Sequence, residues 1–322
     1  MERNIKMDIT SVSRLSKNIT ENIGKVIFGK REQIELIVIS MIAGGHILLD
    51  DIPGTGKTTL ARALAKSISG EVKRIQFTPD LLPSDITGIN YFDQKTSDFV
   101  FRAGPVFTNI LIADEINRTT PRTQSALLEC MGERQTTVDG VTYKLADTFF
   151  VIATQNPIES QGTFPLPEAQ TDRFFMKLAL GYPDRSSEMA MMDIHGVSTP
   201  LEALTPVCTC ADIIAAQNAC KGVTVTEPVK DYILRIIDAT RNNNRISMGV
   251  SPRGTLALLN AARIAAAVDG RDYCIPDDVR RVAVPVLAHR IIARTQSTVR
   301  MSDTNEKLIE FVLDSVEAPI GR

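Results

Sequence analysis

A glycine-rich loop between an apolar run and a helix-forming run constrains the fold of this chain more than any other feature. HILLD (46–50) predicts a buried strand, and Thr58 to Ser69 predict a helix that ends before Gly70. The loop between them turns several backbone N–H groups toward one point at the helix N-terminus, where they can bind phosphate oxygens. We therefore expect a phosphate-binding loop inside a parallel α/β domain.

The loop itself, DIPGTGKTT, supplies most of the expected contacts to a nucleotide. Lys57 is expected to reach the β- and γ-phosphates, and the hydroxyl of Thr58 is expected to bind Mg²⁺. The strict phosphate-loop pattern requires glycine at position 51, where this chain has Asp51, so a turn without a ligand is the alternative. The expected nucleotide-binding residues of the loop are Pro53, Gly54, Thr55, Gly56, Lys57, Thr58 and Thr59.

Four further apolar runs indicate the rest of a parallel sheet. Each run is short, most are almost entirely apolar, and the runs alternate with helical stretches. This pattern is typical of strands that helices cover on both faces. The runs are VKRIQF (72–77), NILIAD (109–114), TFFVIAT (148–154) and FFMKLAL (174–180).

Two adjacent carboxylates, Asp114 and Glu115, stand at the end of one of these runs. Ligands of open α/β sheets lie beyond the carboxyl ends of the strands. Asp114 is therefore expected to hold a water of the Mg²⁺ shell, and Glu115 to polarise the water that attacks the γ-phosphate. A solvated pair of surface carboxylates is the alternative.

Polar and basic residues elsewhere in the chain could complete such a site. Gln155 and Asn156 follow a strand, where an amide could orient the attacking water, although turn formation before Pro157 would also explain them. Arg173 ends a short helix and is either a surface residue or a cation aimed at a neighbour's phosphate. Arg253 lies in the first turn of a helix, where it opposes the helix dipole unless an anion lies nearby.

The second part of the chain has a different pattern. After GYPDR (181–185) we find helical periodicity and almost no strand pattern. We therefore expect an α/β domain at residues 1–183 and a smaller α-helical domain at residues 184–322. Amphipathic helices are expected at 212–220, 229–241, 254–268, 276–292 and 305–316.

The charge balance limits the classes of partner. The chain has 36 Lys and Arg residues and 38 Asp and Glu residues, so its net charge is −2. This balance argues against a protein whose main role is to bind nucleic acid or an anionic membrane. No apolar run approaches the roughly 20 residues of a membrane span, and the N-terminus has no apolar signal segment. The five cysteines are scattered and form no C-x-x-C, so we expect reduced thiols and a cytoplasmic protein.

Several long blocks, in a fixed order, carry a more specific signal than any single motif. They include FGKREQIEL, PGTGKTTLARALA, RIQFTPDLLPSDITG, GPVFTNILIADEINRTTPRTQSALLE, FFVIATQNPIESQGTFPLPEAQTDRF and SPRGTLALLNAARIAA. On these blocks the chain resembles the MoxR family of AAA+ ATPases over nearly its whole length. The family tolerates Asp51 in place of glycine. The departures at Thr171, Cys130 and Gly132 leave the ATP chemistry untouched but could adjust a subunit contact.

The resemblance implies an α/β core with helices on both faces of a sheet in the order 5-1-4-3-2, followed by an α-helical lid. It makes Arg173 the arginine finger that acts on a neighbouring subunit, with Arg118 and Arg122 as rivals. It places adenine near residues 26–29. It implies Lys57 and Thr58 as Walker A residues, Asp114 and Glu115 as Walker B residues, Asn156 as sensor 1 and Arg253 as sensor 2.

The resemblance also implies a function. Such proteins hydrolyse ATP with Mg²⁺, assemble as hexameric rings and remodel partners in a chaperone-like way. The partners often carry a von Willebrand factor A domain, and hairpins expected here at 91–104 and 135–145 would face the centre of the ring. A nucleotide-controlled assembly switch is one alternative, against which the retained Glu115 argues. A nucleic-acid motor is another, against which the few cations on the two hairpins argue.

Overall fold

The computed structural model describes residues 7–50, 54–155, 163–194, 200–294 and 304–319. Its centre is a five-stranded sheet in the order β2-β5-β8-β1-β9, and all four strand pairs are parallel. In chain order this is 5-1-4-3-2, which confirms the expected sheet. The strands are β1 (Ile47–Asp50), β2 (Val72–Gln76), β5 (Ile110–Asp114), β8 (Phe150–Gln155) and β9 (Met176–Leu178).

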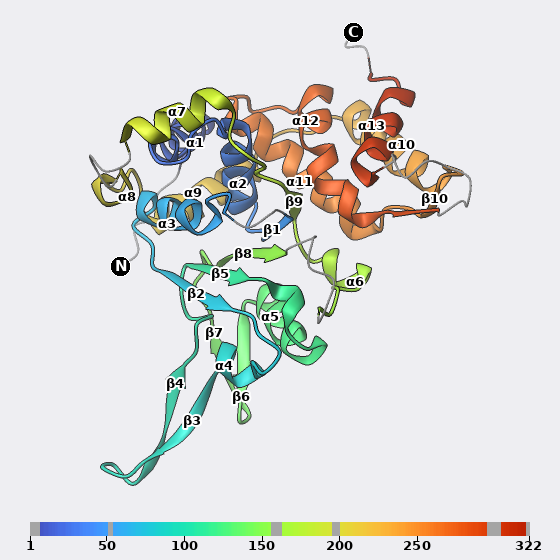
Figure 1. Cartoon of the computed structure of the whole chain (residues 1–322). Helices are drawn as coiled ribbons and strands as arrows, with labels where there is room; N and C mark the ends of the chain where they lie inside the picture. Colours follow the sequence, from blue (N-terminus) through green and yellow to red (C-terminus); the bar gives the residue numbers. More distant parts are fainter. Residues whose placement is uncertain (1–6, 51–53, 156–162, 195–199, 295–303, 320–322) are drawn as a thin grey trace.

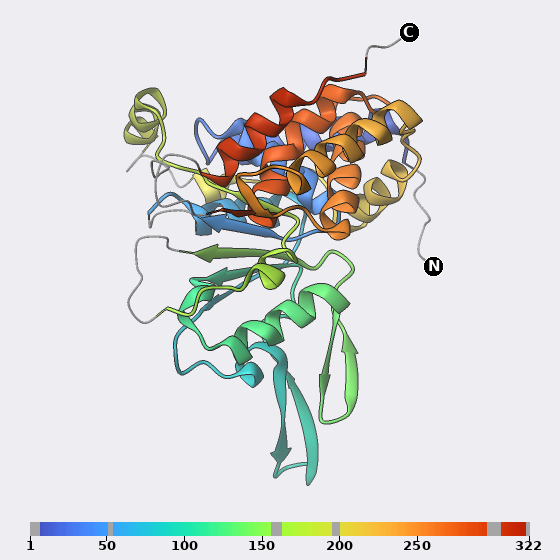
Figure 2. The same cartoon turned by 90° about the vertical axis from the view of Figure 1, so that its right-hand side faces the viewer.

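The sheet lies between two unequal layers (Figure 1, Figure 2). A thick helical layer covers one face, and α4 (Pro83–Thr87) and α5 (Pro121–Glu133) lie on the other. Side chains alternate between the two faces along each strand, so Ile110 and Ile112 join one apolar cluster whereas Leu111 and Ala113 join the other. Because both faces are covered, the central strands carry uninterrupted apolar runs.

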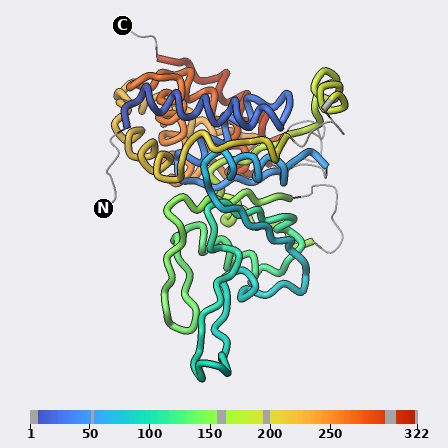
Figure 3. The backbone as a smooth tube through the Cα atoms, turned by 90° about the vertical axis from the view of Figure 1, so that its left-hand side faces the viewer, coloured from blue at the N-terminus to red at the C-terminus, as the bar shows by residue number. Residues whose placement is uncertain are grey.

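The helical layer combines both ends of the chain. The N-terminal α1 (Ile9–Gly24) lies along α11 (Pro252–Val268), and Figure 3 shows α1 as a blue helix across the orange ones. One apolar cluster joins α1 and α2 to the later helices, and the division near residue 183 stays a prediction. No helix in the described parts of the chain is long and apolar enough to cross a membrane. The remaining helices of the layer are α2 (Arg31–Ile42), α3 (Lys57–Ser67), α7 (Arg185–Ile194), α8 (Pro200–Ala203), α9 (Cys210–Cys220), α10 (Glu227–Arg241), α11 (Pro252–Val268), α12 (Pro276–Leu287) and α13 (Asn305–Ser315).

The helix predicted at 276–292 is wrong beyond Leu287. Pro285 has no N–H to donate to the preceding turn, and the guanidinium of Arg290 folds back to donate to the carbonyl of Val286. The chain then forms a 3₁₀ turn, η2 (Ala288–Arg290), and the short strand β11 (Ile292–Ala293). This strand pairs with β10 (Ile246–Met248) in an antiparallel ribbon.

Two hairpins project from the face opposite the helical layer (Figure 1, Figure 2). They are β3 (Gly88–Asp93) with β4 (Asp98–Ala103), and β6 (Gln135–Val138) with β7 (Val141–Lys144). The second hairpin turns at Asp139 and Gly140, whose φ values of 49° and 81° suit the tight turn that the sequence predicts. Near the tip of the first, Phe92 and Phe99 are exposed and contact each other edge to face.

All five cysteines have free thiols. Burial raises the pKa of Cys130 to about 11 and those of Cys208, Cys220 and Cys274 to about 12. A thiol with a raised pKa stays protonated near neutral pH and reacts slowly. These four cysteines therefore behave as apolar side chains rather than as reactive groups.

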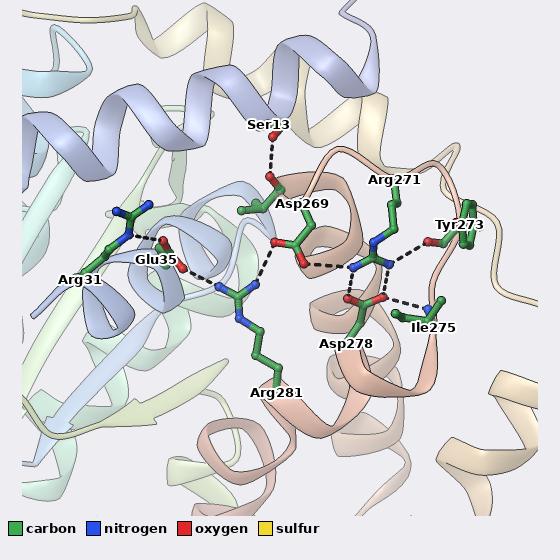
Figure 4. Close-up of polar contacts among 10 residues, drawn as sticks. Ser13, Arg31, Glu35, Asp269, Arg271, Tyr273, Ile275, Asp278 and Arg281 are labelled. Carbon is green, nitrogen blue, oxygen red and sulfur yellow. Dashed lines mark hydrogen bonds and ion pairs between the residues drawn. The ribbon is translucent and has the colours of Figure 1, made fainter. Parts of the chain in front are cut away.

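An ionic network joins the N-terminal helices to the later ones (Figure 4). Arg281 on α12 donates to Glu35 on α2 at 2.6 Å and to Asp269 at 3.1 Å. Arg271 extends the network from Asp269 to Asp278. The side chains of Glu35 and Arg281 are 21% and 27% exposed, so water and salt weaken this contact. We define the ionic network as Arg31, Glu35, Asp269, Arg271, Asp278 and Arg281.

Candidate nucleotide site

A cavity of about 350 Å³ lies where the parallel strands β1, β5 and β8 end. Ligands of α/β sheets bind at this edge because loops and helix N-termini converge there. The cavity is lined by Gly54, Gly56, Lys57, Thr58, Thr59, Arg74, Gln76, Asp114, Glu115, Thr154 and Gln155. The structure therefore brings together most of the residues that the sequence predicts for nucleotide binding.

The loop before α3 has the backbone conformation that its glycines allow. Gly54 and Gly56 have φ values of 88° and 87°, which side chains disfavour. Gly56 is the N-cap of α3, so the helix begins at Lys57 and directs its first N–H groups toward the cavity. Asp51 and Pro53, both named in the sequence predictions, lie outside the described residues.

Asp114 ends β5 and is almost buried. Its Oδ2 forms an ion pair with the Nε of Arg74 at 2.6 Å. Its Oδ1 accepts a hydrogen bond from the hydroxyl of Thr154 at 3.3 Å. The Asp114 side chain is 10% exposed, whereas that of Arg74 is 52% exposed. Arg74 can therefore leave the carboxylate for water without leaving a buried cation behind.

Glu115 has a backbone conformation that is rare for residues other than glycine. Its φ and ψ are 57° and 50°, a left-handed conformation that costs on the order of 1–3 kcal/mol and clusters at functional sites. Its Oε2 accepts from the Nε2 of Gln76 at 2.7 Å and from the Nε of Arg118 at 3.0 Å. The hydroxyl of Thr154 accepts the Glu115 N–H at 2.9 Å, which holds this conformation in place.

Sequence reasoning missed Arg74, Gln76 and Thr154 as members of the site. Arg74 and Gln76 are exposed residues on either side of buried Ile75 in β2, so they share one face of the strand. The parallel register places Gln76 beside Asp114. The sequence predicted this strand, and the alternation of polar residues at its end could have indicated that Arg74 and Gln76 face the site.

The remaining predicted residues divide between the cavity and other positions, and Thr55 is not among the described residues that line the cavity. Gln155 lines the cavity, and Asn156 is outside the described residues. Arg173 and Arg253 are not among the described residues that line it. The Nη1 of Arg173 donates to the carbonyl of Leu128 on α5 at 2.8 Å. The Nη1 of Arg253 lies 4.0 Å from the carboxylate of Asp172, an anion at the N-terminus of α11 that relieves the conflict with the helix dipole.

The site suits Mg²⁺ held jointly by protein and substrate. Among the described residues, no group of three or more His, Cys, Asp or Glu could hold a metal ion. Mg²⁺ prefers oxygen ligands and is usually bound by one or two carboxylates together with the phosphates of a substrate. The Thr58 hydroxyl and the Asp114 carboxylate line the same cavity and provide oxygen donors of this kind.

Comparisons with known proteins agree with this geometry. The model of the ATPase family associated with various cellular activities (AAA) matches residues 46–176, and that of the AAA lid domain matches residues 238–310. Chaperone MoxR1 of Mycobacterium tuberculosis is 38% identical over 317 residues, which cover 96% of this chain and 83% of the relative. The chain belongs to the MoxR family of AAA+ ATPases.

Two further similarities extend over almost the whole MoxR chain. The uncharacterized protein YeaC of Bacillus subtilis is 47% identical over 302 residues, 94% of each chain. A crystal structure from Cytophaga hutchinsonii, named a "putative ATPase", is 37% identical and covers 97% of each chain with a TM-score of 0.89. This MoxR protein is therefore an ATPase with the AAA+ fold followed by an α-helical lid.

Proposed function

We propose that the cavity at the carboxyl ends of the sheet binds ATP with Mg²⁺ and hydrolyses it. The N–H groups of the loop and of the first turn of α3 would hold the phosphates, and Lys57 would contact the β- and γ-phosphates. Thr58 and Asp114 would hold Mg²⁺, which when bound neutralises phosphate charge. The Glu115 carboxylate would polarise the water that attacks the γ-phosphate.

One observation carries this proposal. Asp114 and Glu115 face the same cavity as the phosphate loop, and each carboxylate is paired with a side chain that water reaches. Arg74 and Arg118 are 52% and 39% exposed, so both can be displaced when a nucleotide and Mg²⁺ enter. A permanently buried pair at these positions would leave no free carboxylate for the chemistry.

We further propose that the active site is completed between subunits of a hexameric ring. Asn156 would sense the γ-phosphate, and Arg253 on α11 would contact the nucleotide of its own subunit. Arg173 would neutralise charge on the γ-phosphate of the neighbouring subunit in the transition state. Arg118 and Arg173 both contact their own chain, at Glu115 and at the carbonyl of Leu128, so Arg118 and Arg122 stay rival candidates for the residue that reaches a neighbour.

The hydrolysis would drive chaperone-like remodelling of partner proteins in the cytoplasm. The relative from M. tuberculosis is named a chaperone, and the MoxR family membership supports partners with a von Willebrand factor A domain. The exposed apolar residues of the β3–β4 hairpin support contact with a partner protein, and the few cations on the two hairpins argue against nucleic acid. Unpaired cysteines throughout the chain support a reducing compartment.

Mixing two inactive variants tests the shared site. Glu115→Gln should lower turnover by about 10²–10⁴-fold, and Arg173→Ala by about 10³–10⁵-fold. If Glu115 of one subunit meets Arg173 of the next, mixed rings contain interfaces with both wild-type residues. The ATPase rate should then rise with mixing and reach a maximum near equal amounts. A flat, inactive curve despite proven subunit exchange would reject Arg173 in this role and favour Arg118 or Arg122.

A further inference from the structure

A buried arginine links the lid to the segment that carries Arg173. Arg290 lies in η2, and its side chain is only 2% exposed. Its Nε donates to the Oδ1 of Asp172 at 2.8 Å, and Nη2 donates to the carbonyl of Phe174 at 2.6 Å. Burial lowers the pKa of Arg290 to about 10 against the opposing effect of Asp172, so the guanidinium stays charged near neutral pH.

Asp172 is the point where the core and α11 meet. It lies between the one-turn helix α6 (Glu168–Thr171) and β9, and it immediately precedes Arg173 in the chain. Its Oδ2 accepts from the hydroxyl of Ser251 at 3.1 Å, and the Nη1 of Arg253 lies 4.0 Å from the same oxygen. Ser251 is the N-cap of α11, so one carboxylate contacts both the start of this helix and the buried Arg290.

The first turn of α11 lies directly on the Arg290 side chain. A Cβ added at Gly254 would lie 2.9 Å from the Cδ of Arg290 and 2.4 Å from the Cγ1 of Val250, closer than real Cβ atoms approach. Glycine at this position therefore allows the close contact between α11 and Arg290. Because the contact is so close, α11 and Asp172 cannot shift independently of each other.

We propose that Asp172 and Arg290 are positioning residues that make the placement of Arg173 depend on the placement of α11. This inference rests on the proposed action of Arg173 on a neighbouring subunit. Arg253 stands on α11, and Arg173 directly follows Asp172 in the chain. A shift of α11 on nucleotide binding in one subunit would thus move the arginine that serves the next subunit. The state of one site would be passed to its neighbour.

Asp172→Asn tests this link because it removes the charge and keeps the size of the side chain and one accepting oxygen. A misplacement of about 1 Å can cost about 10²-fold in rate. We expect kcat to fall by about 10- to 100-fold, while ATP affinity stays within about threefold. A general loss of structure would instead lower binding and turnover together.

Mixed rings show through which residue Asp172 acts. If it acts through Arg173, Asp172→Asn should regain activity when mixed with Glu115→Gln but not when mixed with Arg173→Ala. Every interface in the second mixture would receive a faulty arginine. Recovery with Arg173→Ala, or a wild-type kcat for Asp172→Asn, would overturn the inference and leave the proposed function intact. Failure of Glu115→Gln and Arg173→Ala to restore each other despite proven subunit exchange would overturn this inference together with the proposed role of Arg173, and would leave ATP hydrolysis at the cavity untouched.

Ser251→Ala is a milder variant that keeps the buried ion pair and should fold even if Asp172→Asn does not. It removes the hydrogen bond between α11 and Asp172 together with the cap that the Ser251 hydroxyl provides for the N–H of Gly254, so kcat should fall several-fold with the same pattern of recovery. Ser13→Ala is the matched control, because Ser13 donates to the carbonyl of Val268 at the opposite end of α11. Ser13→Ala should leave kcat unchanged. Equal losses in Ser251→Ala and Ser13→Ala would contradict a specific role for the junction at Asp172.

Discussion

Asp114 and Asp172 each pair with an arginine at nearly the same distance, but in different surroundings. Asp114 lies 2.6 Å from Arg74, whose side chain is 52% exposed. Asp172 lies 2.8 Å from Arg290, whose side chain is 2% exposed. Water can solvate the guanidinium of Arg74 when its pair opens. The guanidinium of Arg290 is out of reach of water, so no solvent would compensate its charge if Asp172 moved away.

The difference shows that the exposure of the arginine, rather than the distance, separates a pair that can open from one that stays closed, because the Asp114 side chain is itself only 10% exposed and that of Asp172 is 19% exposed. Because Arg74 is half exposed, it can leave for water at low cost once Mg²⁺ replaces it beside the nearly buried Asp114 carboxylate. Breaking a buried pair by removing one partner costs about 3–5 kcal/mol. The first pair therefore suits a ligand site and the second a fixed junction between the lid and the core.

The largest expected effect on stability is that of Arg290→Met. This substitution leaves Asp172 without its ionic partner and removes donors to the carbonyls of Phe174 and Val286. We expect the free energy of unfolding to fall by about 3–5 kcal/mol in urea titrations. Arg74→Met is the comparison variant and should cost less, because it removes no donor to a buried carbonyl, although it leaves the nearly buried Asp114 carboxylate without its cation. Equal effects of the two substitutions would refute the distinction by burial.

The next effect concerns binding in the cavity. Lys57→Ala removes a charge-assisted contact that is worth about 1.5–3 kcal/mol, so ATP affinity should fall about tenfold or more. Lys66→Ala, in the last turn of the same helix, is the control and should bind ATP normally. Titration with a fluorescent ATP analogue measures both. Unchanged affinity in Lys57→Ala would reject the assignment of the phosphate loop.

A smaller effect is expected when Arg74 no longer competes for Asp114. Arg74→Met should raise Mg²⁺ affinity in the presence of ATP by up to about fivefold, since an exposed pair is worth about 1 kcal/mol at most. Asp114→Asn should act in the opposite direction and weaken the response to Mg²⁺. Weaker Mg²⁺ binding in Arg74→Met would show that Arg74 contacts the phosphates instead of competing with the metal.

The smallest effect is expected in the ionic network, which is intermediate in exposure. Arg281→Met should lower the free energy of unfolding by less than about 1 kcal/mol, and salt should reduce the difference further. Denaturation at low and high salt measures this. A large, salt-independent loss in the free energy of unfolding would show that Arg281 forms a closed, buried pair like that of Arg290.

Local sequence signals predicted much of the sheet and the cavity. Apolar runs marked the central strands because helices cover both faces of the sheet there, whereas β2 at the edge carries exposed polar residues beside buried Ile75. Glycines at positions 54 and 56 marked the phosphate loop because the backbone there has positive φ. The strand order came from the family resemblance, since periodicity alone does not fix which strands are neighbours.

The junction at Asp172 could not be predicted because it depends on contacts between distant parts of the chain. Arg290 follows an apolar stretch in a segment that favours a helix, and only its contact with Asp172, 118 residues away, explains its burial. The buried Arg290 side chain also donates to the carbonyl of Val286, near the point where α12 ends at Leu287. The N-terminal helices α1 and α2 were also missed, although their packing against α11 completes the helical layer.

The most direct test of the account is whether one cavity both binds and hydrolyses ATP through Glu115. Glu115→Gln keeps the size of the side chain and removes the carboxylate that polarises water. With Mg²⁺ present, ATP should bind with nearly wild-type affinity while steady-state turnover falls by about 10²–10⁴-fold. Glu310→Gln, the same change at an exposed residue of α13, should keep both properties. Undiminished turnover in Glu115→Gln would contradict the account.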